Sequence, residues 1–459
     1  MCASRARDAE TALIAPAWRA GEVAVVGLGR TGVAASGWLA DHGVRVYASD
    51  ADGRPELRDV AEKLRAKSVV VDVGLHDLQR IKECVAVVVS PGVPPNAPPI
   101  VAAHAAGVEV VSELDLAARM LTDSKLIVVT GTNGKTTTTA LIAHLLRAAG
   151  RSAEAAGNIG RPLIALADGS TPLEWVVVEA SSFQLHDSPS LAPAIGVLTN
   201  LAPDHLDRYQ SVDAYYADKQ RLFRNATAAS IWMLNGDDVG VLELAKDAAG
   251  EQRRWSTRAA ADAWWNRSSN KMIVGDREVA DRAQLPLLGD HNVENALAAL
   301  LVVAAVGVDV TAMGRALETF SPLPHRLERV RDIHGVLWIN DSKATNVAST
   351  RVALDAMDRP FVLIAGGQDK GESFEPLAPL LGNCRQMIVY GATAKKFQQQ
   401  LGNTVHLIVV DSLESAVRLG VDNAQSGEQV LLSPACPSFD QFRNFEARGD
   451  EFKRLVGNL

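Results

Sequence analysis

The chain of 459 residues is 47% hydrophobic, enough apolar material for about three globular domains. Its formal net charge of -8 argues against a protein that binds nucleic acid by general charge attraction. The four cysteines lie far apart and form no Cys-x-x-Cys pair, so we expect no zinc site and no disulfides, and a reducing compartment such as the cytoplasm. No signal-peptide pattern is present, and the longest apolar run, residues 296–308, is shorter than the ~20 residues of a membrane span. We expect a buried helix there and no membrane insertion.

The first block of the chain predicts a parallel α/β sheet. Strands are expected at residues 23–26, 44–47 and 85–89, and a helix at residues 33–42. Four prolines are expected to mark a loop, namely Pro94, Pro95, Pro98 and Pro99.

A glycine-rich turn follows the first strand of this block. Gly27, Gly29 and Gly32 form a Gly-x-Gly-x-x-Gly pattern, and Asp50 comes about twenty residues later. The glycines let the backbone approach a diphosphate, and the carboxylate can bind ribose hydroxyls. Taken alone, this fingerprint indicates an NAD-dependent oxidoreductase.

The central block contains a second glycine-rich loop, Thr-Gly-Thr-Asn-Gly-Lys-Thr, at residues 130–136. It follows an expected buried strand and begins an expected helix, the context in which backbone N–H groups and a helix N-terminus bind phosphate. Lys135 can reach the β- and γ-phosphates, and the Thr136 hydroxyl can bind Mg²⁺. The general pattern has a glycine where this chain has Val129, so the loop is a shorter variant. The alternative is an ordinary strand-to-helix turn.

Three further side chains near this loop can serve carboxylate activation. Glu179 ends an expected strand, where a carboxylate faces the ligand crevice of a parallel sheet and can hold Mg²⁺. His205 lies in the sequence Asp-His-Leu-Asp-Arg, and Lys219 follows in an expected helix. Taken alone, His205 is better explained as a loop histidine capped by Asp204, and Lys219 as a solvated surface lysine.

These motifs, in this order, resemble those of the Mur ligases and of their relative folylpolyglutamate synthase, which join a carboxylate to an amino acid by way of an acyl phosphate. The resemblance covers nearly the whole chain after the first twenty residues. It implies an α/β protein of three domains: a Rossmann-like domain that binds a UDP substrate (1–112), a central P-loop ATPase-type domain with a mostly parallel sheet (113–322), and a Rossmann-like domain that binds the amino acid (323–459).

The resemblance also implies an ATP site with two Mg²⁺ ions. The side chains it implies to be catalytic are Lys135, His205, Lys219 and Arg326. Those it implies to bind ATP are Gly131, Thr132, Asn133, Gly134, Lys135, Thr136, Thr137, Asn292, Asn295, Arg326, Asp341 and Lys343. Those it implies to bind metal are Thr136, Glu179, His205 and Lys219.

Several of these roles have a physical reason. Lys219 is implied to be carbamylated, and a buried lysine loses its proton more easily, so that its neutral amine can add carbon dioxide. Asn292 and Asn295, three residues apart, can read adenine from one helix face, although Asn292 is equally a helix cap. Arg326 suits the γ-phosphate because its guanidinium is planar and permanently charged. Asp341 is implied to bind the ribose.

The third block predicts a doubly wound sheet, with strands expected at residues 336–339, 361–364, 387–389, 407–409 and 430–432. Its sequence Ser-Pro-Ala-Cys-Pro-Ser-Phe-Asp-Gln-Phe, residues 433–442, resembles the D-glutamate-adding members of the family. The residues implied to bind D-glutamate are Thr345, Lys370, Ser438 and Phe445. A lysine and hydroxyls suit an acidic amino acid. The Asp-Asn-Pro-Arg sequence of the diaminopimelate-adding members is not found.

The second substrate implied by the resemblance is UDP-N-acetylmuramoyl-L-alanine. Its implied contacts are Arg30, Thr31, Asp50, Ser90, Asn158 and His205. Arg30 stands where the family has an aliphatic residue. The resemblance implies an enzyme that makes a peptidoglycan precursor, and so serves cell-wall biogenesis, cell shape and cell division. We expect a monomer.

Three alternatives remain open at this stage. The first is another Mur-type ligase or a folylpolyglutamate synthase-like ligase. The second is the NAD-dependent oxidoreductase, which leaves the central phosphate loop unexplained. The third is a non-catalytic nucleotide sensor, against which the intact Lys135, Glu179, His205 and Lys219 argue.

Overall fold

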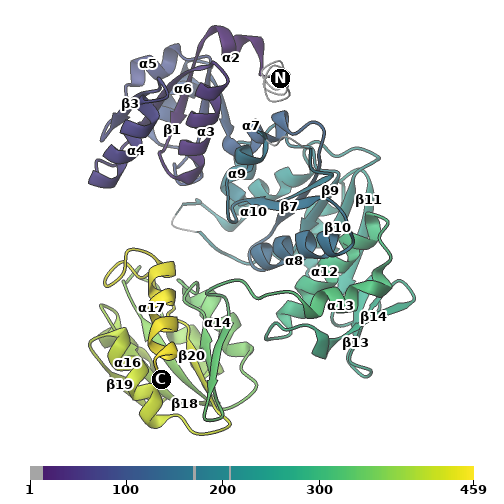
Figure 1. The fold of residues 1–459 in the computed structure, drawn as a ribbon, viewed down its shortest axis with the longest axis vertical. Helices are drawn as coiled ribbons and strands as arrows, with labels where there is room; N and C mark the ends of the chain where they lie inside the picture. Colours follow the sequence, from purple (N-terminus) through teal and green to yellow (C-terminus); the bar gives the residue numbers. More distant parts are fainter. Residues whose placement is uncertain (1–13, 169–171, 206–207) are drawn as a thin grey trace. The chain divides into compact units, whose positions relative to one another are not determined.

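The computed structural model describes residues 14–168, 172–205 and 208–459. The chain divides into two compact units (Figure 1). One comprises the residues up to Gln284 together with Glu294–Leu317, and the other comprises Leu285–Val293 and Glu318–Leu459. The first unit contains two sheets and the second contains one.

The first sheet has five parallel strands in the order β3-β2-β1-β4-β5. Its strands are β1 (Glu22–Val26), β2 (Arg45–Asp50), β3 (Val70–Val73), β4 (Ala86–Val89) and β5 (Glu109–Ser112). Its helices are α2 (Pro16–Ala20), α3 (Arg30–Asp41), α4 (Pro55–Arg65), α5 (Leu78–Glu83) and α6 (Pro98–Ala105). Alternate β1 residues enter different cores: Val23 and Val25 pack with residues of α3 and α4, and Ala24 and Val26 with residues of α5 and α6. The sheet is therefore covered on both faces, as the Rossmann-like prediction requires.

The proline-rich segment departs from the prediction. Pro94 and Pro95 lie outside helices and strands, as expected, but Pro98 and Pro99 form the first turn of α6. The expectation of a loop at these two prolines is wrong, because the first turn of a helix has no use for its N–H groups and the fixed φ of proline suits it.

The second sheet has nine strands in the order β14-β13-β12-β11-β10-β9-β6-β8-β7. Its strands are β6 (Lys125–Thr130), β7 (Ala153–Gly157), β8 (Trp175–Glu179), β9 (Ile195–Leu198), β10 (Ile231–Asn235), β11 (Glu251–Ser256), β12 (Ala263–Asn266), β13 (Lys271–Val274) and β14 (Arg277–Asp281). Only the β12–β13 and β13–β14 pairs are antiparallel. The mostly parallel central sheet is thus confirmed.

The helical segments of this part are α7 (Glu113–Met120), α8 (Lys135–Ala148), η1 (Leu163–Leu166), α9 (Ser182–His186), α10 (Val212–Gln220), η2 (Arg221–Phe223), α11 (Val239–Ala245), η3 (Arg282–Gln284), α12 (His291–Ala305), η4 (Val310–Ala312) and α13 (Met313–Glu318). The apolar run at residues 296–308 lies mostly in α12, and its residues 296–303 are all buried. In the part of the chain that the structure describes, no helix is both long and apolar enough to cross a bilayer.

The third sheet has six strands in the order β15-β16-β20-β17-β18-β19. These are β15 (Glu328–Ile333), β16 (Val336–Asn340), β17 (Phe361–Gly366), β18 (Cys384–Tyr390), β19 (Leu407–Val409) and β20 (Gln429–Leu432), of which only β15 pairs antiparallel. The helical segments are α14 (Val347–Asp355), η5 (Glu375–Leu380), α15 (Ala394–Leu401), α16 (Leu413–Asn423) and α17 (Phe445–Gly457). Leu363 packs in a core with α14 and α15, and Ile364 in another with α16 and α17. The doubly wound arrangement is confirmed.

Candidate active site

The central glycine-rich loop joins β6 to α8 at the carboxyl end of the sheet. Gly131 and Gly134 have φ values of +140° and +81°, and side chains there would lie 1.9 Å from Thr199 Oγ1 and 2.4 Å from Asn295 Oδ1. Both contacts are shorter than any real Cβ contact, so only glycine fits. The backbone N–H of Asn133 donates to the Oδ1 of Asn200 at 2.8 Å. The loop has the strand, turn and helix order of a phosphate site, and Thr136 and Thr137 lie half-buried in the first turn of α8.

Two lysines donate to the same carbonyl of this loop. Lys135 Nζ lies 2.9 Å from the Gly131 carbonyl oxygen and 2.7 Å from that of Thr132, and Lys219 Nζ lies 2.6 Å from that of Gly131. Lys219 is fully buried. Burial, followed by the neighbouring positive charge of Lys135, holds the pKa of Lys219 well below its ordinary value. The burial of Lys219 rules out its interpretation as a solvated surface lysine, and the lowered pKa favours the neutral form of its amine.

Glu179 ends β8 with one carboxylate oxygen fixed. Its Oε1 accepts a hydrogen bond from Asn158 Nδ2 at 2.9 Å, and the residue is 2% exposed. Among the described residues, no group donates to its Oε2. A buried oxygen of this kind suits a divalent cation, which prefers carboxylate oxygens. The described residues contain no cluster of three or more His, Cys, Asp or Glu side chains that would hold a metal by itself. A cation here would need other oxygens, such as those of phosphate or the Thr136 hydroxyl.

His205 has a left-handed backbone conformation, with φ of +55°, and its N–H donates to Asp204 Oδ1 at 2.9 Å. Its ring centre lies 6.1 Å from that of Tyr215, over which Lys219 Nζ lies at 4.6 Å. His205 and Lys219 thus flank one aromatic ring. Leu206 and Asp207 of the same motif lie outside the described residues.

The turn after β1 is braced by its own side chains. Asp50 Oδ2 accepts from the Leu28 N–H at 2.7 Å. Ser90 Oγ donates to the Gly27 carbonyl at 2.8 Å, and Thr31 Oγ1 lies 3.4 Å from Ser90 Oγ. Three of the predicted substrate contacts therefore meet at one turn.

Two other predicted contacts of the UDP substrate meet at the segment after β7. Arg30, at the start of α3, donates through Nη1 to the Gly160 carbonyl at 3.3 Å. Asn158, in the same segment, donates to Glu179.

The two asparagines predicted to read adenine lie in the first turns of α12. Asn292 is the second residue of the helix, and its Nδ2 donates to the Leu288 carbonyl at 2.7 Å. It is therefore not the N-terminal cap. Asn295 accepts from Thr138 Oγ1 at 3.1 Å, which brings it against α8 beside Gly134.

In the second unit, the segment after β16 carries Asp341, Lys343 and Thr345. Asp341 is buried, and its oxygens accept from Ser433 Oγ at 2.8 Å and from the Leu327 N–H at 3.2 Å. Burial raises the pKa of Asp341 to about 7. The half-buried Arg326 lies in the turn before β15.

The residues predicted to bind D-glutamate lie on three segments of this unit. Lys343 Nζ lies 3.8 Å from the ring centre of Phe445, the first residue of α17. Lys370 is exposed in the loop after β17, and Thr345 is half-buried. Ser438 is 2% exposed, and its hydroxyl has no partner among the described residues. Buried hydroxyls are normally hydrogen-bonded, so the lack of a described partner for Ser438 Oγ needs an explanation.

Family comparisons agree along the chain. The Mur ligase MurD-like N-terminal domain matches residues 21–112, the Mur ligase middle domain residues 129–303, and the Mur ligase glutamate ligase domain residues 325–436. The UDP-N-acetylmuramoylalanine--D-glutamate ligase of Syntrophotalea carbinolica is 40% identical over 441 residues, which cover 95% of this chain and 97% of the relative. The ligase of the same name from Acidobacterium capsulatum is 39% identical over 454 residues, covering 95% and 96%. The chain belongs to the Mur ligase family.

Solved structures agree with this membership at the level of fold. UDP-N-acetylmuramate-alanine ligase MurC of Thermotoga maritima superposes with a TM-score of 0.62 at 19% identity, covering 95% of this chain and 99% of that chain. The MurF ligase of Thermotoga maritima in complex with ADP gives 0.60 at 15% identity, covering 90% and 96%. The family, the α/β fold and the ATP-dependent ligase class predicted from the sequence are confirmed.

Two residues of this Mur ligase site were missed from the sequence. Tyr215 contacts both the loop and Lys219: its hydroxyl lies 3.3 Å from Thr132 Oγ1, and Lys219 Nζ lies 4.6 Å from its ring centre. Its position four residues before Lys219 on one helix was the available signal. Arg448 is fully buried and donates to Ser342 Oγ and to the carbonyls of Ser342 and Cys436 at 2.9, 2.8 and 3.0 Å. No sequence signal marks it, because arginines of α17 are expected on the surface.

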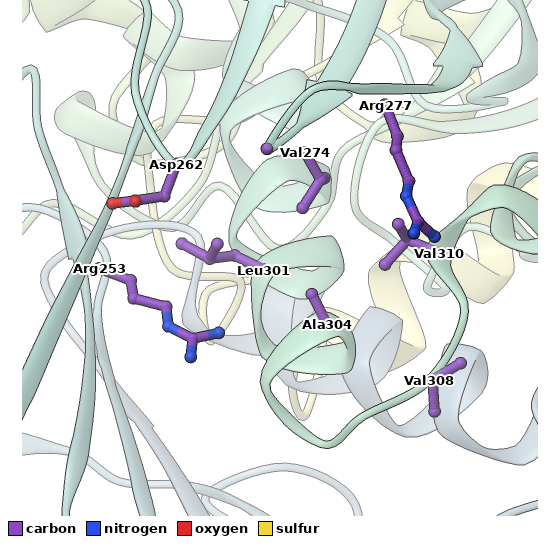
Figure 2. Close-up of a pocket in the computed structure, with 9 residues that line it drawn as sticks. Arg253, Asp262, Val274, Arg277, Leu301, Ala304, Val308 and Val310 are labelled. Carbon is purple, nitrogen blue, oxygen red and sulfur yellow. The ribbon is translucent and has the colours of Figure 1, made fainter.

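The first unit contains a cavity of about 350 Å³. It lies between α12 and the strands β13 and β14 (Figure 2). Leu301 contributes to its apolar wall. Arg253 and Arg277 line it but are paired with Glu251 and Asp309 at 2.7 and 3.2 Å. None of the predicted site residues lines this cavity, so the ligase reaction has no evident use for it.

Proposed function

We propose that this Mur ligase joins D-glutamate to UDP-N-acetylmuramoyl-L-alanine, with ATP as the source of energy. The relatives that carry this activity in their names are 36–40% identical over nearly their whole length. The structural observation that carries the proposal is the buried Ser438 hydroxyl without a partner among the described residues, in the loop that resembles the D-glutamate-adding members. A carboxylate of the amino acid would satisfy it.

ATP would bind the loop of Gly131–Thr136 through converging backbone N–H groups and the N-terminus of α8. Lys135 would contact the outer phosphates, Arg326 the γ-phosphate and Asp341 the ribose. We propose two Mg²⁺ ions, held by Thr136, Glu179, His205 and Lys219. Bound there, Mg²⁺ supplies charge neutralisation on the phosphate oxygens. The Oε2 of Glu179, to which no described group donates, supports this assignment.

Lys219 is proposed to be carbamylated. The Nζ atoms of Lys135 and Lys219 both contact the Gly131 carbonyl, so two positive charges there would repel each other. A neutral Lys219 amine would attack carbon dioxide and lose a proton, which turns the side chain into a carboxylate able to hold metal. Its burial, which excludes water, favours the uncharged amine.

The reaction proceeds in two steps in this proposal. The terminal carboxylate of the sugar peptide attacks the γ-phosphorus of ATP, which gives an acyl phosphate and releases ADP. The amine of D-glutamate then attacks the acyl carbon and loses a proton, and inorganic phosphate leaves. Lys135 and Arg326 would stabilise charge on the transferred phosphoryl group. Thr31, Ser90 and Asn158 would hold the UDP-sugar end, and Lys370, Thr345 and Phe445 the amino acid.

We also propose that the enzyme works as a monomer in the cytoplasm, where ATP and UDP-linked sugars are available. The three described cysteines, Cys84, Cys384 and Cys436, are buried thiols, which fits a reducing compartment. The role in peptidoglycan precursor synthesis follows from the product.

A panel of amino acids tests the substrate. Phosphate release would be measured with UDP-N-acetylmuramoyl-L-alanine, ATP and, in turn, D-glutamate, L-glutamate, L-alanine, L-lysine and meso-diaminopimelate. D-glutamate alone should stimulate release, and Ser438→Ala should raise its KM by about tenfold, the cost of one hydrogen bond to a charged group. Stimulation by another amino acid instead would reject the proposal. Incubation with isotope-labelled bicarbonate should give a carbamate carbon signal in NMR that is lost in Lys219→Arg.

A further inference from the structure

Glu113, in the first turn of α7, is a buried carboxylate that the reaction described above does not use. It is 1% exposed, and its Oε1 accepts from the Ile164 backbone N–H at 2.6 Å. Among the described residues, no group donates to its Oε2. Burial raises the pKa of Glu113 to about 7. A buried carboxyl with half of its bonding capacity unused costs stability, so packing alone does not explain it.

The hydrogen bond from Ile164 fixes the start of η1. The first N–H groups of a helical turn have no partner inside that turn. Glu113, 51 positions earlier in the sequence, provides a hydrogen-bond acceptor for the Ile164 N–H. At its other end the segment begins at Gly157, the last residue of β7, which is paired with Glu179 of β8. Within the segment, the Gly157 N–H donates to the Arg161 carbonyl at 3.0 Å. Residues 157–164 are thus held by β8 at the first end and by Glu113 at the other.

The segment so held carries Asn158, the neighbour of Glu179. Asn158 Nδ2 donates to Glu179 Oε1 at 2.9 Å, and its backbone N–H donates to the Glu179 carbonyl, also at 2.9 Å. Gly157 has φ of +99°, and a side chain there would lie 2.5 Å from the Glu179 carbonyl oxygen. The segment therefore lies directly against β8. The amide of Asn158 orients the carboxylate so that Oε1 is occupied and Oε2 is left for another ligand.

We propose that Glu113 is a positioning residue of the ligase reaction: by holding Ile164 it fixes the segment from which Asn158 orients Glu179. This inference rests on the proposed function, in which Glu179 holds Mg²⁺. Side chains that orient a metal ligand typically change metal affinity or activity about 10- to 100-fold when they are removed. Glu113 acts one step further out, through the backbone of residues 158–164.

The test compares three variants of Glu113 with a matched control. Glu113→Ala removes the acceptor, Glu113→Asp keeps the carboxyl but withdraws it from Ile164, and Glu113→Gln keeps an acceptor of the same length. Asp115→Asn is the control, because Asp115 is a buried carboxylate of the same helix that bonds Arg119 and the Ser190 N–H instead. Each protein is checked for native circular dichroism.

Three readouts separate positioning from folding. Mn²⁺ binding in the presence of a non-hydrolysable ATP analogue, followed by electron paramagnetic resonance, should weaken about tenfold or more in Glu113→Ala and Glu113→Asp. It should change less than about threefold in Glu113→Gln and Asp115→Asn, which keep the Ile164 bond. Hydrogen exchange at the Ile164 amide should accelerate in the first two variants only. The KM for D-glutamate should stay constant in all four.

A double-mutant cycle with Asn158→Ala tests the route of the effect. If Glu113 acts through Asn158, adding Glu113→Asp to Asn158→Ala should weaken Mn²⁺ binding no further. Additive losses, unchanged Mn²⁺ affinity in Glu113→Asp, or an equal loss in Asp115→Asn would each overturn the inference. Absence of D-glutamate-dependent phosphate release by the native enzyme would instead reject the proposed function, whatever the Mn²⁺ data show.

Discussion

The buried Arg448 gives the sharpest prediction about the second unit. Its guanidinium joins the segment after β16 to the loop after β20, through three bonds of 2.8 to 3.0 Å to Ser342 Oγ, the Ser342 carbonyl and the Cys436 carbonyl. In Arg448→Ala these three buried acceptors lose their donor, at about 2 kcal/mol each. Removing the guanidinium also removes the free-energy cost of burying its charge, which offsets part of this loss. We therefore expect the stability of Arg448→Ala to decrease by about 4 kcal/mol. Arg448→Lys should lose about half as much, because one ammonium cannot reach all three acceptors.

The free energy of opening can be measured by hydrogen exchange at the amides of β16 and β20, which report on this unit. The same variants should raise the KM for D-glutamate more than about tenfold, since the Cys436 segment carries Ser438. Arg454→Ala is the control: Arg454 lies on the same helix, is 57% exposed and pairs with Glu451, so its loss should stay within about 0.5 kcal/mol. A loss below about 1 kcal/mol in Arg448→Ala, with an unchanged KM, would refute this reasoning.

Three other predictions concern the loop, the metal and pH. Gly134→Ala should abolish ATP binding in calorimetry, because its Cβ would lie 2.4 Å from Asn295 Oδ1 at a φ of +81°; unchanged affinity would contradict the described loop. Glu179→Gln should raise the Mg²⁺ concentration needed for half-maximal activity about tenfold or more, whereas Glu174→Gln, at an exposed pair with Arg151, should not. The raised pKa of Asp341, about 7 against its ordinary 3.8, means that the native chain keeps a proton that the unfolded chain releases. The contribution of Asp341 to the free energy of unfolding is therefore fully present below pH 3.8. It decreases by at most ~4 kcal/mol as the pH rises to about 7. In melting curves recorded from about pH 5 to about pH 8, the Tm of Asp341→Asn minus the Tm of the native chain should therefore increase as the pH rises.

Periodicity and glycine patterns identified the buried parallel strands well. β6 and β17 lie where apolar runs predicted them, because a strand covered on both faces leaves an unbroken apolar sequence. Edge strands are less consistent: β19 was predicted from its apolar residues, but β15 was not. β15 has the sequence Glu-Arg-Val-Arg-Asp-Ile, in which four of the six residues are charged. The prediction at Pro98 was wrong because proline both interrupts regular structure and is common in the first turn of a helix.

The candidate site was predictable where a motif is local in sequence. The loop around Lys135 and the strand-end carboxylate of Glu179 are of this kind. The burial of Lys219 is not, since it depends on β6 and α10 packing together, and the isolated residue is indistinguishable from a surface lysine. Arg448 and Glu113 were missed for the same reason: Ser342 lies 106 positions from Arg448, and Ile164 lies 51 positions from Glu113.

The most direct measurement is phosphate release from ATP with UDP-N-acetylmuramoyl-L-alanine, with and without D-glutamate, for the native chain and for Lys135→Ala. We expect release that depends on D-glutamate in the native chain and is lost in the variant, because in the proposed reaction Lys135 stabilises charge on the transferred phosphoryl group. Release that is indifferent to D-glutamate, or that survives in Lys135→Ala, would contradict the proposed reaction.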